Sequence, residues 1–282
     1  MKFMVAACQF KPILNQPAIN LEKIEEVLRD MKHRHPDVRL AVLPELVTTG
    51  YKCGDRFFHL AESLNNSSSV NRLSRICREF HLHLIFGMAE RDSQIQEIIY
   101  NSVICIDERG SLLGVYRKVH LTANELHWFK AGSSYPIFHT DLGNIGAFIC
   151  WDTAFPEVAR IYALQGAQLL TISSAWEHPH APVWDLITAA RAVDNILPVV
   201  AANRCGQEYD YHCFGHSRIL DPLGQVIAKS DGEEEVAIVG EVDTQLSSSL
   251  RQNYFTFLKD RRPDTYTVLT ADYPIRAKSF RN

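Results

Sequence analysis

Hydrophobic residues along this chain follow two spacings, one typical of helices and one typical of strands. Apolar side chains recur every three or four residues in 15–31, 70–80 and 183–193, which predicts amphipathic helices there. A further helix is predicted to begin at Pro156, because proline is favoured in a first helical turn, and to end before Gly166. Short apolar runs predict strands at residues 3–9, 38–43, 82–89, 98–106, 112–117, 145–150, 168–172, 199–202, 214–220, 225–228 and 236–242.

Helices and strands alternate in both halves of the chain, and each half also contains consecutive strands, as on either side of residues 107–110. This order predicts an α/β protein in which two sheets pack together and helices cover their outer faces. We expect one domain over residues 1–282, because no linker or shift of composition divides the chain. The segment 250–282 has too irregular a pattern for a core element, and we expect it to pack on a neighbouring subunit.

The composition is that of a globular protein and argues against several classes of function. Of the 282 residues, 46% are hydrophobic and 22% are charged, which is typical of a chain with a large core. A formal net charge of −4 offers no basic surface to nucleic acid or to anionic membranes. No apolar run is long enough to cross a bilayer, and the first residues resemble a strand more than a signal peptide. We therefore expect a cytoplasmic protein without nucleic-acid or membrane partners.

The spacing of cysteines and histidines argues against a bound metal ion. The seven cysteines are scattered and never spaced C-x-x-C, which predicts neither a disulfide framework nor a zinc ribbon. Two histidine pairs, His81 with His83 and His178 with His180, could each place two imidazoles on one side of an extended chain. No carboxylate or cysteine at ligand spacing accompanies either pair, which favours polar surface or hydrogen-bonded loops. The sequence therefore predicts no metal site.

Three residues with complementary chemistry directly follow predicted strands: Glu45, Lys118 and Cys150. Functional groups of α/β proteins gather beyond the carboxyl ends of strands, so we expect these side chains to converge. A thiol becomes a strong nucleophile when a carboxylate removes its proton, and a lysine can hold the oxyanion that attack creates. The backbone N–H of Trp151 is a candidate second donor to that oxyanion. Singly, the three residues are typical of a core cysteine, a turn and a surface charge; together they predict acyl transfer.

The segments around these residues resemble three motifs of the nitrilase superfamily, also called carbon–nitrogen hydrolases. They are residues 43–51 (LPELVTTGY), 116–121 (YRKVHL) and 149–157 (ICWDTAFPE), in the order that the superfamily shows. The resemblance extends along nearly the whole chain, from Gln9 to beyond residues 221–224. It implies a four-layer α-β-β-α sandwich that is usually paired into dimers. We therefore expect a homodimer or a higher homo-oligomer.

The resemblance also implies roles for individual residues. The Glu-Lys-Cys triad of the superfamily falls on Glu45, Lys118 and Cys150. A further glutamate of the superfamily precedes an aromatic segment that ends in glycine, and residues 125–132 (ELHWFKAG) fit that description. Glu125 is thus the fourth catalytic candidate, which positions substrate and lysine; an exposed loop carboxylate is the other interpretation. Neither a metal nor a cofactor is implied.

The residues after the nucleophile indicate a branch of the superfamily. True nitrilases usually follow the cysteine with Trp-Glu, whereas this chain has Trp151 and Asp152, which resembles the amidase and N-carbamoyl-amine branches. We therefore expect hydrolysis of a small amide to carboxylate and ammonia through a thioester. Cleavage of an N-carbamoyl amine is the alternative, and nitrile hydrolysis is less expected. Tyr51, Trp151 and Trp176 are the candidates for lining the substrate pocket, whereas Phe155 is more typical of the core.

The sequence leaves two functions of other classes open. A catalytically silent scaffold could keep the fold for protein binding, although it would not need the four reactive groups. A redox sensor at Cys150 is the other, although no resolving cysteine lies nearby in the sequence. Fast alkylation of Cys150 with loss of amidase activity distinguishes the enzyme from the scaffold.

Overall fold

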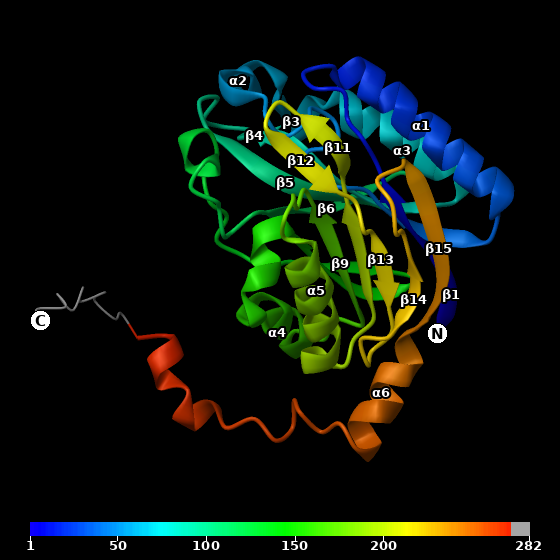
Figure 1. The fold of residues 1–282 in the computed structure, drawn as a ribbon, viewed down its shortest axis with the longest axis vertical. Coiled ribbons are helices and arrows are strands. Elements are labelled where there is room, and N and C mark those ends of the chain that lie inside the picture. The colour runs from blue at the N-terminus through cyan, green and yellow to red at the C-terminus, as the bar shows by residue number, and fades with distance from the viewer. Residues whose placement is uncertain (272–282) are drawn as a thin grey trace, which may run out of the picture.

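Two β-sheets lie face to face in the computed structural model, which describes residues 1–271 (Figure 1). The first sheet has the order β15-β1-β2-β4-β5-β6, and the short β3 pairs with β4. Its central strands β1, β2 and β4 are parallel, whereas β15, β5 and β6 join antiparallel to their neighbours. The strands are β1 (Lys2–Gln9), β2 (Val38–Val42), β3 (Glu62–Ser63), β4 (His83–Arg91), β5 (Ile99–Ile106), β6 (Leu112–Arg117) and β15 (Val236–Asp243).

The second sheet has the order β14-β13-β10-β9-β8-β7. Strands β8, β9 and β10 are parallel and form its centre, and the outer strands are antiparallel. Strands β11 and β12 form a separate ribbon of two antiparallel strands. The strands are β7 (Ile137–Thr140), β8 (Gly143–Ile149), β9 (Leu169–Ser174), β10 (Val199–Asn203), β11 (Cys205–Glu208), β12 (Tyr211–Phe214), β13 (Arg218–Leu220) and β14 (Val226–Lys229).

Helices cover the outer faces of both sheets, which confirms the predicted α/β fold with an α-β-β-α order of layers. In Figure 1, α1 and α3 lie side by side on the first sheet, and α4 and α5 lie together on the second. The buried residues of α1, among them Leu21, Ile24 and Leu28, have the predicted amphipathic spacing. The helices are α1 (Pro17–Arg34), α2 (Phe57–Leu60), α3 (Ser68–Phe80), α4 (Pro156–Leu164), α5 (Ala181–Asn195) and α6 (Thr244–Asn253).

The structure differs from the sequence prediction mainly near the edges of the sheets. The strands β7, β11 and β12 were not predicted, because their residues form neither an apolar run nor a regular alternation of polar and apolar positions. Helix α6 continues into the segment predicted to be irregular, and its serine-rich sequence is a weak helix former. The Asp243 side chain caps this helix by accepting a hydrogen bond from the Gln245 N–H at 2.9 Å.

The C-terminal segment leaves the sheets after α6 and contains only short 3₁₀ turns up to residue 271 (Figure 1). It touches the main body, since Leu258 packs against the core. Helix α6 itself is held there by Arg251, which donates a hydrogen bond to the Asn195 carbonyl. Packing of residues 250–282 on a neighbouring subunit and the single domain over 1–282 stay predictions, and residues 272–282 lie outside the described part. Within residues 1–271, no helix combines the length and the apolar character that crossing a membrane requires.

Candidate active site

Glu45, Lys118 and Glu125 form a hydrogen-bonded cluster inside the protein. The Lys118 Nζ atom lies 2.7 Å from Glu45 Oε1, and 2.7 and 2.9 Å from the two carboxylate oxygens of Glu125. Asn101 Nδ2 donates to both carboxylates, at 2.6 Å to Glu45 and 2.9 Å to Glu125. All four side chains are buried. Glu125 is therefore part of the cluster rather than an exposed loop carboxylate.

The backbone around Glu45 is fixed by strand β4 of the first sheet. The Gly87 N–H donates to the Pro44 carbonyl, and the Gly87 carbonyl accepts from the Val47 N–H. A side chain at Gly87 would lie 2.7 Å from the Glu45 Cα atom, so glycine is required for this close approach. The turn after β2 is thus held against β4, and it directs Glu45 toward the lysine.

Lys118 and Glu125 are fixed by the segment that follows β6. The Lys118 N–H donates to the Asn101 carbonyl on β5, and the Lys118 carbonyl accepts from the Gly132 N–H, both at 2.8 Å. Glu125 begins a 3₁₀ turn, Glu125–His127, and its Oε2 accepts from the Thr122 N–H at 2.8 Å. The loop therefore folds back so that a residue seven positions after the lysine reaches its ammonium group.

Burial and charge move the pKa values in this cluster in different directions. Burial raises the pKa of Glu45 to about 7, although the Lys118 charge opposes this. Burial alone would lower the pKa of Lys118, but Glu125 and Glu45 outweigh it and raise that pKa well above the ordinary value. Burial acts to raise the pKa of Glu125, but the charge of Lys118 and its hydrogen bonds lower it. Among the described residues, Glu45 Oε2 has no hydrogen-bond partner, so it is available to accept a proton.

Cys150 directly follows β8 and begins the 3₁₀ turn Cys150–Ala154. Its φ of 46° is in the left-handed region that non-glycine residues rarely adopt, a form of strain that often marks functional sites. Burial raises the pKa of its thiol well above the ordinary value; Glu45 raises it further, and Lys118 lowers it. The charges of Glu45 and Lys118 thus act on the thiol, and it needs a base to become a thiolate.

Asp152 connects the turn of Cys150 to the loop of Lys118. Its buried carboxylate accepts hydrogen bonds from the Tyr116 hydroxyl at 2.7 Å, the His120 N–H at 3.0 Å and the Ile149 N–H at 3.1 Å. The ring of His120 also contacts this carboxylate, with Nδ1 2.8 Å from Asp152 Oδ1. From the sequence, Asp152 indicated only the branch of the superfamily, and its role as a link between the two loops was not predicted. Its place inside the cysteine motif was the available signal.

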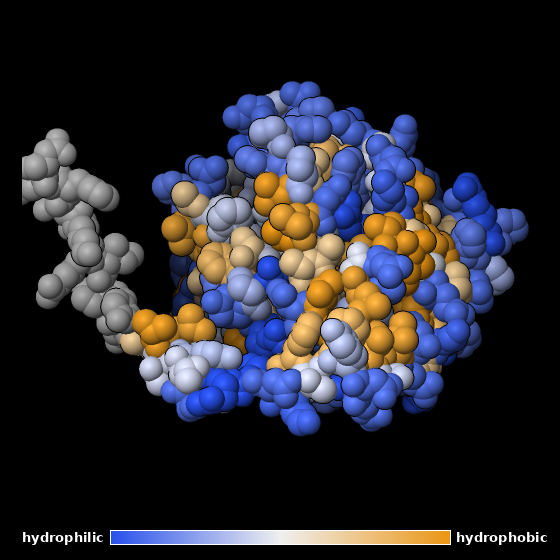
Figure 2. Space-filling view, turned by 60° about the horizontal axis from the view of Figure 1, so that its bottom comes forward, coloured by the Kyte–Doolittle hydropathy of each residue, from blue (hydrophilic) through white to orange (hydrophobic). Residues whose placement is uncertain are grey.

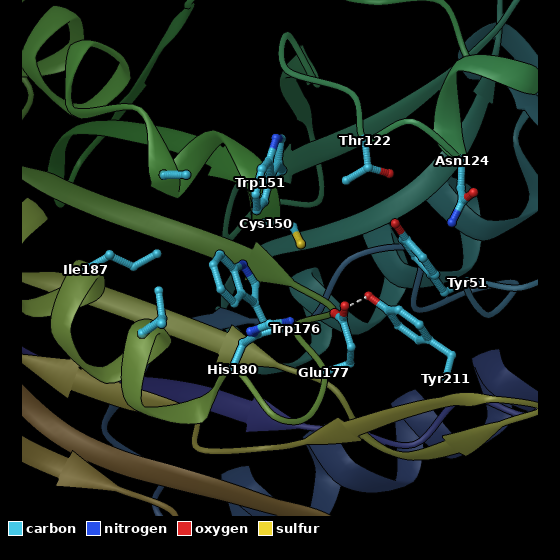
Figure 3. Close-up of a pocket in the computed structure, with 12 residues that line it drawn as sticks. Tyr51, Thr122, Asn124, Cys150, Trp151, Trp176, Glu177, His180, Ile187 and Tyr211 are labelled. Atoms are coloured by element: carbon cyan, nitrogen blue, oxygen red, sulfur yellow. Dashed lines mark hydrogen bonds between the residues drawn. The ribbon is translucent and has the colours of Figure 1, made fainter. Parts of the chain in front are cut away.

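A cavity of about 440 Å³ opens in front of the Cys150 sulfur (Figure 3). All three predicted pocket residues, Tyr51, Trp151 and Trp176, lie in its wall, whereas Phe155 is absent from it. Phe155 instead stacks on a histidine ring and packs against the core, as expected. The full lining consists of Tyr51, Thr122, Asn124, Cys150, Trp151, Ala154, Trp176, Glu177, His180, Val183, Ile187 and Tyr211.

The polar side of this cavity was not predicted from the sequence. Tyr211 of β12 stacks on Tyr51, with ring centroids 4.8 Å apart, and its hydroxyl donates to Glu177 Oε2 at 2.8 Å (Figure 3). His180 lies three residues after Glu177, between β9 and α5. No sequence signal marked Tyr211, because the ribbon of β11 and β12 was itself not predicted.

Comparison with known proteins agrees with this geometry. The family model described as carbon-nitrogen hydrolase matches residues 4–252. A probable nitrilase from Schizosaccharomyces pombe is 45% identical over 95% of this chain and 99% of its own length. The 2-oxoglutaramate amidase of Bacillus subtilis is 33% identical over 94% of this chain and its whole length. The crystal structure of a carbon-nitrogen hydrolase from Helicobacter pylori superposes with a TM-score of 0.90 at 28% identity, covering 97% of this chain and all of that one. This chain therefore belongs to the carbon–nitrogen hydrolase family, the nitrilase superfamily.

Proposed function

We propose that this protein hydrolyses a small linear amide to a carboxylate and ammonia, with Cys150 as the nucleophile. Membership of the carbon–nitrogen hydrolase family makes it an amidase-like enzyme. The observation that carries the proposal is the buried cluster of Glu45, Lys118 and Glu125, whose charges act on a thiol that faces a cavity. The 2-oxoglutaramate amidase among the relatives supports an amide as the substrate.

In the first step, Glu45 takes the proton of the Cys150 thiol and the thiolate attacks the amide carbon. A carboxylate whose pKa is raised to about 7 is well suited to this transfer at neutral pH. Lys118 Nζ and the backbone N–H of Trp151 hold the oxyanion that forms. Because Nζ already contacts three carboxylate oxygens, one of its two bonds to Glu125 lengthens as the oxyanion binds.

In the second step, the tetrahedral intermediate collapses and protonated Glu45 gives its proton to the departing ammonia. The C–N bond breaks and the acyl group stays on Cys150 as a thioester. Water then enters, Glu45 takes one of its protons, and the hydroxide adds to the thioester carbon. Collapse of this second intermediate releases the acid, and the proton returns to the Cys150 sulfur. Glu125 keeps Lys118 charged and in place throughout both steps.

The cavity supports a short or flat acyl group. Indole rings of Trp151 and Trp176 line one side, and Val183 and Ile187 extend this apolar wall. Trp176 is 5% exposed, so its ring is fixed by packing and limits the length of the substrate. Cleavage of an N-carbamoyl amine at the same site is the alternative reaction, and it differs in releasing carbon dioxide together with ammonia.

We also propose that the chain forms homodimers in the cytoplasm. Leu164 on α4 and Leu186 on α5 are large apolar side chains that are 49% and 71% exposed. Figure 2 shows one face of the molecule on which hydrophobic residues gather in patches among hydrophilic ones. All seven cysteines are unpaired and buried, which suits a reducing compartment.

A substrate panel combined with mass spectrometry tests the enzymatic proposal. Small amides, N-carbamoyl amines and nitriles are each offered to the enzyme, and the products and the mass of the protein are measured. We expect carboxylate and ammonia from an amide, and an acyl adduct on Cys150 when turnover is stopped rapidly. Carbon dioxide release would assign the N-carbamoyl branch instead.

A matched pair of cysteine variants serves as the control. Cys53 is as buried as Cys150, at 5% exposure, but lies outside the cavity lining. Cys150→Ala should abolish turnover and adduct, whereas Cys53→Ala should retain both. No turnover of any substrate, with equally slow alkylation of all thiols, would support the silent scaffold and contradict the enzyme.

A further inference from the structure

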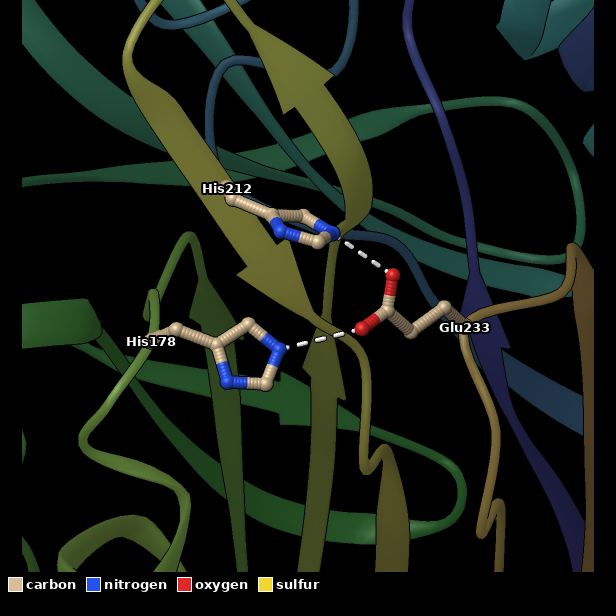
Figure 4. Close-up of side chains that lie close together, drawn as sticks. All are labelled: His178, His212 and Glu233. Atoms are coloured by element: carbon tan, nitrogen blue, oxygen red, sulfur yellow. Dashed lines mark hydrogen bonds and ion pairs between the residues drawn. The ribbon is translucent and has the colours of Figure 1, made fainter.

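The side chains of His178, His212 and Glu233 meet at the surface from three separate segments. His178 follows β9, His212 lies in β12, and Glu233 lies between β14 and β15. The His178 Nε2 atom is 3.0 Å from Glu233 Oε1, and the His212 Nε2 atom is 2.7 Å from Glu233 Oε2. Figure 4 shows the carboxylate between the two rings, with both Nε2 atoms directed at it. The three side chains are 43–45% exposed, so an ion from solvent can reach them.

We propose that these three residues bind a divalent transition-metal ion of the zinc type. Two imidazole nitrogens and one carboxylate are ligands that Zn²⁺ prefers, and three protein ligands leave its fourth position to water. One ligand atom from each residue lies within 4.8 Å of the others. Zinc ligands at about 2.0–2.2 Å from the metal stand roughly 3–4 Å apart, so small rotations of the rings complete the site.

The backbone that carries these ligands is already fixed. The His178 N–H donates to the His212 carbonyl at 2.9 Å, which holds the two histidines together. Gln9, a fully buried residue, donates from Nε2 to the carbonyls of Gly232 and Glu234, each at 2.8 Å. The residues on both sides of Glu233 are therefore held by the core. A site in which the backbone needs no ordering loses less entropy when the ion binds.

A second cluster, His83 with Glu108 and Asp141, is less suited to such an ion. It offers a single imidazole, and the His83 side chain is 1% exposed. Both carboxylates already contact its Nε2 atom, at 3.0 and 3.1 Å. An ion at Nε2 would have to replace both contacts inside the protein.

The position of the proposed metal site connects it with the substrate cavity. Glu177 and His180, which flank His178, line the cavity, and so does Tyr211, the neighbour of His212. A bound ion would therefore join the segment after β9 to the β11–β12 ribbon at the cavity wall. The reaction at Cys150 does not pass through this ion, so metal binding and catalysis can be tested separately.

Zinc binding is measured by titration calorimetry on tag-free, chelator-treated protein. The protein carries Cys150→Ala, so that the active-site thiol cannot bind the metal. We expect one Zn²⁺ per chain with micromolar or tighter affinity, and an increase of Tm when zinc is added. Co²⁺ in place of Zn²⁺ should give visible absorption bands from tetrahedral coordination.

Two variants and one matched control decide the assignment. His212→Gln and Glu233→Gln should each weaken zinc binding at least about tenfold and remove the Co²⁺ bands. His59→Gln changes another exposed histidine and should leave the affinity as it was. The proposal is overturned if zinc does not bind at micromolar concentration. It is equally overturned if both cluster variants bind zinc as tightly as the parent protein.

Discussion

The Glu45–Lys118–Glu125 cluster and the His178–His212–Glu233 cluster both unite charged side chains that are far apart in the sequence. They differ in their contact with water: the first is 0–3% exposed, and the second is 43–45% exposed. In the buried cluster, desolvation raises the pKa of Glu45 to about 7. In the exposed cluster, the two histidines lower the pKa of Glu233. Contacts with Lys118 or with the histidines act to lower the pKa of both glutamates, but burial outweighs these contacts at Glu45 and not at Glu233.

This difference decides what each cluster can do. A buried carboxylate near its pKa at neutral pH can exchange a proton with a thiol, and no water competes for it. An exposed carboxylate stays ionised, and water can replace either of its partners at little cost. The buried cluster is therefore suited to acid–base chemistry and is sensitive to substitution. The exposed cluster is suited to exchange its hydrogen bonds for a metal ion.

The largest effect is expected from Lys118→Met. The change leaves two buried carboxylates without their cation, so the free energy of unfolding should fall by about 3–5 kcal/mol. Amidase activity should fall at least about 10²- to 10³-fold, because an oxyanion donor is lost. Denaturant titration and steady-state kinetics measure the two effects.

Lys229→Met is the matched control for that experiment. Lys229 pairs with Asp231, and both side chains are largely exposed. The free energy of unfolding should change by less than about 1 kcal/mol. Equal destabilisation by the two lysine variants would mean that burial does not set the cost of losing the lysine.

The next effect concerns the pH dependence of the reaction. Glu45 must be deprotonated to take the Cys150 proton, and its pKa is raised to about 7. The value of kcat/KM should therefore fall as the pH decreases through about 7, the midpoint belonging to the coupled cluster as a whole. Glu45→Gln should lower kcat by about 10²- to 10⁴-fold and abolish this acidic limb.

The exposed Glu241, which pairs with Lys2, provides the comparison for Glu45. Glu241→Gln should keep both the rate and the acidic limb of the wild-type profile. A wild-type profile that stays flat from pH 8 to well below 7 would exclude Glu45 as the base.

A smaller effect is expected from Asp152→Asn, which keeps the size of the side chain but removes its charge. The amide retains one acceptor oxygen, so bonds from Tyr116, His120 and Ile149 are partly lost. The cost should be about 1–3 kcal/mol in unfolding free energy. Because these bonds hold the turn of Cys150, their loss should displace the nucleophile and lower kcat by up to about 100-fold with little change in KM.

In Asp152→Asn, the alkylation rate of Cys150 distinguishes a displaced thiol from a loss of protein stability alone. We expect slower alkylation in Asp152→Asn, and a smaller decrease in Tyr116→Phe, which removes one of the donors to the carboxylate. An unchanged kcat and alkylation rate in Asp152→Asn would show that the carboxylate does not position the thiol.

The sequence predicted the elements whose pattern is long or has a clear boundary. Strand β6 has the predicted bounds, and α4 begins at Pro156 as expected. Strand β12 was missed because its four residues, Tyr-His-Cys-Phe, show no regular alternation of polar and apolar positions. Helix α6 was missed: its first residues were assigned to no element and its end lies in the segment 250–282 predicted to be irregular, since serine-rich helices depend on capping and tertiary contacts more than on propensity.

Site residues that lie in a recognisable motif could be predicted from the sequence. Site residues that only the fold brings together could not. The contacts among Glu45, Lys118 and Glu125 follow from segments with recognisable spacing. Asn101, which donates to both carboxylates, lies inside strand β5, and nothing in its neighbourhood indicates its partners. Likewise, His178 and Glu233 are 55 residues apart, so spacing rules for metal ligands could not join them.

The smallest effect, and the sharpest comparison, comes from replacing one glutamate by glutamine in each cluster. Without metal, Glu233→Gln should change the free energy of unfolding by less than about 1 kcal/mol, because water replaces the lost ion pairs. Glu125→Gln should cost several times more, since Lys118 then keeps a charge in the protein interior with one anionic partner fewer. Parallel denaturant titrations of the two chelator-treated variants measure the difference. If Glu233→Gln proved as destabilising as Glu125→Gln, the exposed cluster would be a structural ion pair rather than an adjustable ligand set.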